Sequence, residues 1–230
     1  MKEINSFVPP NLGWLEVKLD DEELKFLWDC VNTPPQENKK PSLAGNISES
    51  WTLIDKDDWF FNNTLSKCMV RYAEAFKNLG EEFPTPHRHP YFLESFWSNY
   101  QKENEFNPIH KHSGIYSFVI WLKIPTSYDE QTQNPIAYGV NADAISNFQF
   151  VYTDIIGRSV QHTYQMDPQY EGCMVFFPAA LKHTVYPFYN CKEDRISISG
   201  NIGINSSVIL LTEEEAKMYP EYDEEAKNRG

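Results

Sequence analysis

From Tyr91 onward the chain is a succession of short segments rich in aromatic and β-branched residues, separated by proline, glycine and polar residues. This pattern is typical of β-strands joined by turns. Strands at this spacing indicate a sandwich or a barrel, so we expect a mainly β domain over residues 91–211. The strands are expected at 91–99, 117–124, 148–153, 172–177, 184–188 and 195–204.

The first 90 residues have a different pattern, which predicts an extension of helices and loops. A short helix is expected at 20–27, because acidic residues occupy its first turn, where the helix dipole favours them. A loop follows over 34–50. A longer helix is expected at about 57–79, with apolar residues at three- and four-residue spacing and Gly80 to end it.

Two further segments are polar and have no strand pattern. The connection 126–147 is long, and a connection of this length beside a site is either a lid or a surface excursion. The acidic tail 212–230 predicts a solvated helix or a disordered end.

Composition excludes several classes of protein. Of the 230 residues 41% are hydrophobic and 15% aromatic, which is enough for a real core and unlike a disordered chain. The net charge of −13 repels a phosphate backbone and argues against a nucleic-acid-binding surface. Neither a bilayer-spanning segment nor a signal peptide is evident, so we expect a cytoplasmic protein without a membrane partner. The four cysteines, which form no C-x-x-C, are expected to be reduced thiols.

Three histidines form the candidate metal site. His110 and His112 are two residues apart, and in an extended strand they would project from the same face. His183 lies between two apolar runs that predict neighbouring strands. Two ligands from one strand and one from a distant strand make a facial set, which leaves one side of a metal open as catalysis requires. The alternative is an ordinary surface H-x-H.

The last predicted strand alternates strictly. Its isoleucines share one face, and the other face carries Arg195, Ser197, Ser199 and Asn201. An arginine beside a hydroxyl can hold a carboxylate through a bidentate fork and a second donor. The alternative is a salt bridge on a solvated face, and the nearby His183 favours the carboxylate site.

Four phrases in this region carry a resemblance to a known family. They are FNPIHKH at 106–112, GCMVFFP at 172–178, LKH at 181–183 and RISISGN at 195–201. In this order they resemble the iron(II)- and 2-oxoglutarate-dependent oxygenases, most closely a group of small 2OG-Fe(II) oxygenases frequent in tailed phages and marine bacteria. The resemblance covers roughly Trp97 to Asn201. It implies a double-stranded β-helix (jelly roll, cupin-like) core, with the N-terminal helices packed against it.

The resemblance also implies an activity. The protein would be a dioxygenase that hydroxylates a small-molecule or peptide substrate and releases succinate and CO2 from 2-oxoglutarate. His110, His112 and His183 would bind Fe(II).

Four further residues are expected to bind the co-substrate 2-oxoglutarate. By the same resemblance, Arg195 would receive its distal carboxylate with help from Ser197. Asn99 and Tyr100, on the strand before the H-x-H, are expected to line the pocket, as is Trp97; ordinary core packing is the alternative for these side chains.

One position departs from the family pattern. The common motif is His-x-Asp/Glu, and this chain has His112 where the carboxylate would be. Three neutral imidazoles would leave the metal with its full positive charge. A genuine three-histidine iron site, a carboxylate supplied from elsewhere (Asp154 is the candidate) and a loss of hydroxylase activity all remain open.

Other functions are compatible with the same residues. They are a three-histidine cupin-type dioxygenase that uses no 2-oxoglutarate, a zinc site on three histidines, and a non-catalytic jelly-roll binding module. Arg195 distinguishes the first of these, because a buried carboxylate clamp is expected only where 2-oxoglutarate binds.

Overall fold

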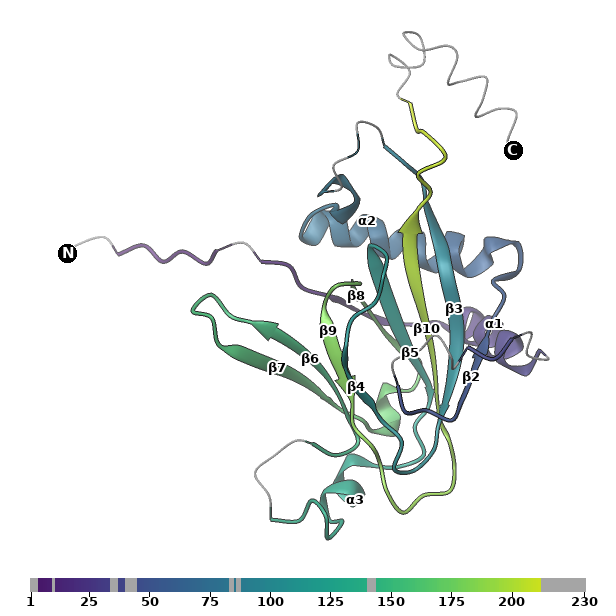
Figure 1. The fold of residues 1–230 in the computed structure, drawn as a ribbon, viewed down its shortest axis with the longest axis vertical. Helices are drawn as coiled ribbons and strands as arrows, with labels where there is room; N and C mark the ends of the chain where they lie inside the picture. The colour runs from purple at the N-terminus through teal and green to yellow at the C-terminus, as the bar shows by residue number, and fades with distance from the viewer. Residues whose placement is uncertain are drawn as a thin grey trace.

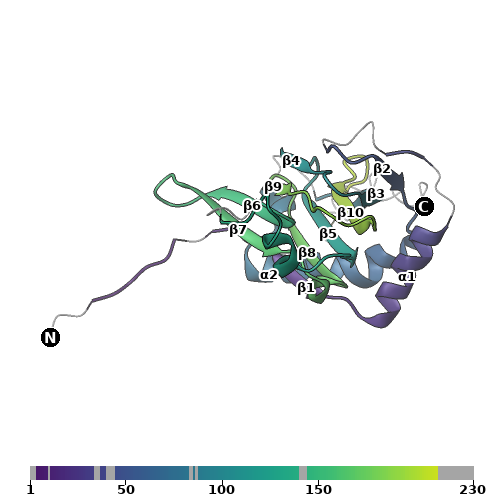
Figure 2. The ribbon, with the colours of Figure 1, turned by 90° about the horizontal axis from the view of Figure 1, so that it is seen from below.

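The computed structural model describes residues 4–9, 11–33, 37–39, 45–82, 85, 88–139 and 144–211. Two antiparallel β-sheets face each other, and two helices cover the outer side of the larger sheet (Figures 1 and 2). The acidic tail 212–230, with its expected helix or disorder, lies outside the described residues. Within these ranges, no helix combines the length and the apolar character needed to cross a membrane.

The larger sheet has six strands in the order β1-β8-β5-β10-β3-β2, and the smaller has four in the order β4-β9-β6-β7. The bounds are β1 Leu15–Lys18, β2 Glu49–Thr52, β3 Tyr91–Gln101, β4 Asn107–His110, β5 Tyr116–Lys123, β6 Asn147–Thr153, β7 Ser159–Gln165, β8 Cys173–Pro178, β9 Lys182–Val185 and β10 Arg195–Ile204.

From β3 onward the chain passes back and forth between the two sheets. β3, β5, β8 and β10 belong to the larger sheet, and β4, β6, β7 and β9 belong to the smaller. Eight strands distributed in this way form a jelly roll, so the predicted double-stranded β-helix is confirmed. β1 and β2 extend the larger sheet at its two edges.

Three strands were not predicted from the sequence: β1, β2 and β7. The first two lie in the N-terminal region, and β2 begins at Glu49, inside the segment expected to be a loop. β7 has mostly exposed side chains, so it lacks the apolar alternation by which a strand is recognised.

The helix α1 spans Asp21–Asn32 and begins with a capping box. The Glu23 backbone N–H donates to the Asp20 side chain, and the Asp20 N–H donates to the Glu23 side chain, each at 2.9 Å. This reciprocal pair satisfies two N–H groups that the first helical turn leaves free. The expected acidic helix start is therefore present, and the helix runs further than expected.

The long expected helix is interrupted and shorter than predicted. A 3-10 turn (Lys56–Asp58) and a π-helical turn (Phe61–Leu65) precede α2, which spans Ser66–Ala75. Phe76 leaves the helical region (φ −131°, ψ −87°), so the helix ends before Gly80. Three shorter helical segments follow later in the chain: 3-10 turns at Leu79–Glu82 and Pro168–Tyr170, and α3 at Tyr128–Thr132.

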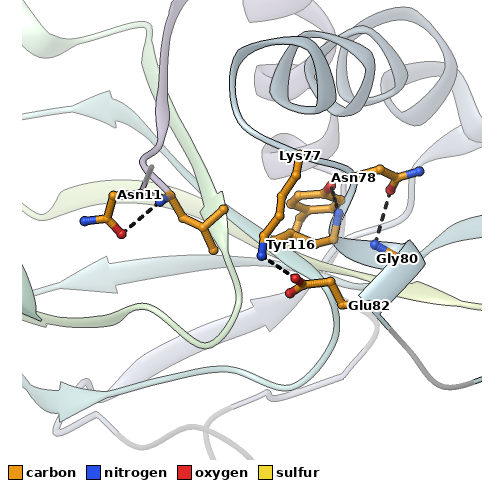
Figure 3. Close-up of polar contacts among 8 residues, drawn as sticks. Asn11, Lys77, Asn78, Gly80, Glu82 and Tyr116 are labelled. Atoms are coloured by element: carbon orange, nitrogen blue, oxygen red, sulfur yellow. Dashed lines mark hydrogen bonds and ion pairs between the residues drawn. The ribbon is translucent and has the colours of Figure 1, made fainter. Parts of the chain in front are cut away.

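Hydrogen bonds anchor the connection after α2 to the larger sheet (Figure 3). The Leu79 N–H donates to the hydroxyl of Tyr116, the first residue of β5, at 3.2 Å. The Gly80 N–H donates to the Asn78 side chain at 3.2 Å, and Lys77 forms an ion pair with Glu82. These bonds replace the helical ones that end at Phe76, and the bond of Leu79 joins the connection to β5.

The core consists of two clusters of buried side chains. The first fills the space between the helices and the larger sheet. Its fully buried members include Leu27, Phe60, Tyr72 and Phe176, which come from different parts of the chain. The second lies between the two sheets and is mostly aromatic. Its buried members are Val119, Trp121, Ile124, Phe148, Phe150, Tyr164, Met166, Val175 and Phe177. Burial of these large side chains supplies the main favourable free energy of folding.

Gly200, in the middle of β10, tests how tightly the larger sheet is packed. A methyl group there would lie 2.5 Å from Cζ of Phe118 and 2.8 Å from the carbonyl oxygen of Ser95. We expect Gly200→Ala to lower the free energy of unfolding by about 2 kcal/mol, because overpacking forces neighbouring groups to shift. Urea denaturation measures this change.

The matched control is Gly203→Ala, on the same strand. Its methyl group would come no closer than 3.1 Å, to the ring of the exposed Phe92, which is free to move. This variant is expected to lose less than about 1 kcal/mol. Equal losses for the two glycines would contradict the tight contact at Gly200.

Candidate metal centre

The structure brings the three predicted histidines together between the sheets. His110 ends β4 and pairs in register with His183 on the neighbouring β9. His112 comes two residues after the end of β4, and its backbone N–H donates to the Ala179 carbonyl at 2.9 Å. One ring nitrogen of each residue lies within 4.8 Å of the other two. The strand expected to carry both His110 and His112 thus holds only the first.

Hydrogen bonds to carbonyl groups fix two of the rings. Nδ1 of His110 lies 2.7 Å from the Pro108 carbonyl oxygen, and Nδ1 of His183 lies 3.1 Å from that of Leu181. A ring nitrogen that faces a carbonyl oxygen must be the protonated one. In each neutral ring Nε2 is therefore unprotonated, which is the form that binds a metal.

The third ring, that of His112, lies close to the ring of His183. Nε2 of His112 lies 3.2 Å from Nε2 of His183. Two such nitrogens face each other at this distance only if a proton or a metal ion lies between them. Burial lowers the pKa of all three histidines: that of His112 falls to about 4, and that of His183 falls well below its usual value. Charge on the neighbouring rings lowers the pKa of His112 and of His183 further. The rings are therefore neutral at pH 7, and a divalent metal fits the space better than a proton.

No carboxylate belongs to this cluster within the part of the chain that the structure describes. Asp154 lies in the turn between β6 and β7, where its side chain accepts hydrogen bonds from the backbone of Ile156 and Arg158 and from Nε of Arg158 at 2.7 Å. It caps that turn. The expectation that Asp154 could complete the metal site is therefore wrong, and the three imidazoles remain as the donor set.

Arg195, the first residue of β10, is a buried cation. Its side chain is 2% exposed, and burial lowers its pKa to about 9, which still leaves it charged at pH 7. It donates to the Ser146 hydroxyl at 2.5 Å and to the Gln101 side chain at 3.4 Å, and it lies over the Phe188 ring.

None of these partners of Arg195 is an anion. Within the described residues no ion pair includes Arg195, and its Nε has no hydrogen-bond partner. A buried charge without a counter-ion costs several kcal/mol, so the site fits an anionic ligand. The alternative of a solvated salt bridge on this face is wrong.

A cavity of about 430 Å³ joins the arginine to the histidines. One wall is the polar face of β10, and the register places β3 side chains beside it: Gln101 by Arg195, Asn99 by Ser197, Trp97 by Ser199 and Ser95 by Asn201. The three histidines line the same cavity from the smaller sheet. The cavity therefore runs from a buried cation, past a metal-binding cluster, toward the Asn201 end of β10.

The alternation of side chains along β3 decides which of the expected pocket residues line the cavity. Asn99 lines the cavity, and its side-chain oxygen accepts a hydrogen bond from Ser50 at 2.8 Å, which leaves its N–H groups available. Ser197 and Trp97 also line it, and the indole N–H of Trp97 is buried without a partner among the described residues. Tyr100 does not line the cavity, because successive side chains of a strand point to opposite faces. The expectation for Tyr100 is wrong.

Hydrogen bonds hold two described parts of the long connection before β6. Gln131 in α3 donates to the Tyr189 carbonyl at 2.9 Å and accepts from the Tyr189 N–H at 2.8 Å. The described end of the connection brings Ser146 to Arg195. Sequence reasoning missed Ser146 and Gln101; the second could have been found, because it shares a strand face with Asn99.

Residues 95–201 match the model of a protein family described as "Putative 2OG-Fe(II) oxygenase". This segment of the chain is therefore similar to the 2OG-Fe(II) oxygenase family. The matched segment contains the three histidines, Arg195 and the strands that hold them. Enzymes of this oxygenase family are oxidoreductases that use Fe(II) and 2-oxoglutarate, and the neutral imidazoles and the unpaired buried arginine fit these two groups.

Comparison with solved structures finds oxygenases of similar extent but low identity. A Pseudomonas putida prolyl-4-hydroxylase is 15% identical, with a TM-score of 0.49, over 84% of this chain and 94% of that one. A 2OG-Fe(II) oxygenase from Burkholderia pseudomallei is also 15% identical, with a TM-score of 0.46, over 83% and 85%. A viral collagen prolyl hydroxylase of Paramecium Bursaria Chlorella virus-1, in complex with 2OG, is 13% identical, with a TM-score of 0.44, over 82% and 94%. No curated protein sequence matches the chain.

Proposed function

We propose that this protein is an iron(II)- and 2-oxoglutarate-dependent dioxygenase that hydroxylates a small-molecule or peptide substrate. One observation supports the proposal most directly: a single cavity is lined by three converging neutral imidazoles and by a buried arginine without a counter-ion. The first feature suits a divalent metal, and the second suits a carboxylate.

In this proposal, His110, His112 and His183 hold iron(II) through their Nε2 atoms. The carbonyl groups of Pro108 and Leu181 keep two of these rings in the required tautomer and orientation. When bound, the metal and its co-substrate supply the oxidative chemistry, in which dioxygen, 2-oxoglutarate and a C–H bond give succinate, CO2 and an alcohol.

Arg195 receives the distal carboxylate of 2-oxoglutarate, with Ser197 as a second donor on the same face of β10. Ser146 and Gln101 hold the guanidinium in place, and the ligand supplies the missing negative charge. Asn99 and Trp97 line the same cavity and carry N–H groups that can serve as donors for its remaining oxygens. The surrounding aromatic cluster excludes water from the reacting atoms.

The competing functions leave part of this arrangement unused. A three-histidine dioxygenase without 2-oxoglutarate, or a zinc site, would need no buried cation beside the metal. A non-catalytic binding module would need neither the buried cation nor the metal-binding histidines. Because an unpaired buried charge is costly, Arg195 favours the enzyme that binds a dicarboxylate.

Succinate formation tests the proposal without knowledge of the substrate. We expect protein loaded with Fe(II) to convert 2-oxoglutarate slowly to succinate in the presence of oxygen, and faster when a panel of metabolites supplies the substrate. The same protein loaded with Zn(II) is the control, since zinc has no redox chemistry. A lack of succinate from Fe(II)-loaded, 2-oxoglutarate-bound protein under every condition would contradict the proposal.

A further inference from the structure

Glu94 and Lys111 line the cavity with opposite charges, at the end away from Arg195. We propose that these two side chains recognise the substrate and that the substrate is a small zwitterion of the free α-amino acid kind. Glu94 would bind its ammonium group and Lys111 its carboxylate. The inference rests on the proposed function, which assigns the Arg195 end of the cavity to 2-oxoglutarate.

A β-bulge brings Glu94 to the cavity. β10 pairs Asn201 with Ser95 and Ile202 with Leu93, so Glu94 has no partner on β10. In regular alternation, Glu94 would point to the same side as Phe96, which packs into the core behind the sheet. The bulge instead places it with Ser95 among the cavity-lining residues. Bulges redirect side chains in this way beside active sites.

Lys111 reaches the same rim from the smaller sheet. β4 ends at His110, and Lys111 begins the loop that leads to β5. Two backbone hydrogen bonds hold this loop: His112 N–H to Ala179 at 2.9 Å and Ile115 N–H to Ile202 at 2.7 Å. The second bond lies next to the bulge. Lys111 is therefore held beside the metal-binding rings although its side chain is exposed.

The two charges are neighbours that do not neutralise each other. The Glu94 carboxylate lies against the Lys111 loop, since a Cβ on Gly114 would be 3.3 Å from its Oε2. Within the described residues neither Glu94 nor Lys111 takes part in any ion pair. Two unpaired, opposite charges at one rim are complementary to a ligand that carries both signs.

The charges of the remaining cavity residues support the same substrate class. Glu94 is the only carboxylate among the described residues that line the cavity. Arg195 and a divalent metal on neutral imidazoles carry more positive charge than the dianion 2-oxoglutarate carries negative charge, so this end of the cavity leaves no negative charge for a cationic substrate group. Lys39 also lines the cavity, from the segment that pairs with β2 on the far side of β3, and it takes no part in the proposed recognition.

The cavity size favours a free molecule. About 430 Å³ lies in the lower part of the range for small-molecule sites, about 300–1,000 Å³. 2-Oxoglutarate would occupy the Arg195 end. The rest suits one compact molecule of comparable size, and a free amino acid meets both the size and the charge requirement.

The test measures binding of the twenty common amino acids by calorimetry, without oxygen, to protein loaded with Fe(II) and 2-oxoglutarate. The amino acid that binds best is then compared with its N-acetyl derivative, which lacks the ammonium, and its methyl ester, which lacks the carboxylate. Each derivative is expected to bind roughly two- to fivefold more weakly, as for contacts of exposed charges.

Two variants identify which side chain recognises which charge. Glu94→Gln should weaken binding of the amino acid roughly two- to fivefold but leave binding of the N-acetyl derivative unchanged. Lys111→Gln should weaken binding of the amino acid by a similar factor and leave binding of the methyl ester unchanged. Glu22→Gln and Lys56→Gln, exposed charges outside the cavity, are the matched controls. Metal content is measured for Lys111→Gln because its neighbours are the proposed ligands.

The outcomes separate this inference from the proposed function. If 2-oxoglutarate does not bind to the metal-loaded protein, the proposed function fails, and the substrate inference fails with it. If 2-oxoglutarate binds but no amino acid does, or if the neutralised derivatives bind as well as the parent, only the substrate inference is overturned. If both variants bound the amino acid and both derivatives more weakly, the substrate inference would also be overturned, because the loss of affinity would then not depend on the charge that each ligand carries.

Discussion

His183→Ala is expected to abolish metal retention while the jelly roll remains folded. His183 is 4% exposed, contacts both other rings, and has its Nδ1 proton held by the Leu181 carbonyl. Its loss leaves two imidazoles, and only His110 of these has its ring fixed by a carbonyl group. Since loss of a mere orienting partner already costs 10- to 100-fold in metal affinity, loss of a ligand should cost more than about 100-fold. Elemental analysis after dialysis measures the retained metal.

The matched control is His162→Ala. His162 lies exposed on β7, where its ring contacts Trp14 and Tyr164 and no metal-site residue. This variant should retain metal as the wild type does, and circular dichroism should show that both variants are folded. His112→Asp, which restores the carboxylate of the common family motif, keeps three ligands and should also retain metal. Full metal content in His183→Ala would show that the ion binds elsewhere.

Much of the site could be predicted because its residues follow strand alternation within short segments. The spacing of His110 and His112, and the polar face that begins at Arg195, are local patterns, and both face the cavity in the structure. The position of His183 needed only the expectation that two apolar runs form neighbouring strands. The register that pairs it with His110 could not be read from the sequence.

The residues that sequence reasoning missed depend on contacts between distant segments. Ser146 reaches Arg195 only because the end of the connection before β6 lies against the start of β10. Glu94 enters the cavity only because β3 contains a bulge, and a bulge depends on the pairing of two strands. Tyr100 differs from these residues, because the strand alternation that places Asn99 in the cavity turns its neighbour to the opposite face of β3.

The fold was predicted where burial leaves an apolar pattern. β5 and β10 are buried on most positions and were recognised, whereas β7 is largely exposed and was not. The end of α2 was misplaced by its apolar periodicity, which continues beyond Ala75. There the hydrogen bonds of Leu79 and Gly80 to side chains of the sheet and of Asn78 replace the helical ones, and local propensity gives no sign of such tertiary contacts.

Arg195→Met is expected to remove the response to 2-oxoglutarate and to leave metal binding intact. The guanidinium donates to Ser146 and Gln101, and its Nε is free for a ligand. Removing one partner of a buried, hydrogen-bonded charge pair costs about 2–5 kcal/mol, so 2-oxoglutarate should bind roughly 30- to several-thousand-fold more weakly. In wild-type protein loaded with Mn(II), 2-oxoglutarate at five times its Kd should add about 1 kcal/mol of stability. At the same concentration the variant should gain no more than about 0.1 kcal/mol, so its melting temperature should show no measurable rise.

The stability of the ligand-free variant distinguishes a binding role for Arg195 from a structural one. Because the buried guanidinium has no counter-ion among the described residues, methionine of similar length should leave the melting temperature unchanged or raise it. If Arg195 had a structural role, its replacement would instead lower the stability by as much as other substitutions that break a buried hydrogen-bond network. Arg158→Met, at an exposed side chain in the β6–β7 turn, is the control that should keep the full 2-oxoglutarate response. A variant that still responds to 2-oxoglutarate, or that unfolds without it, would show that Arg195 supports the sheet rather than the co-substrate.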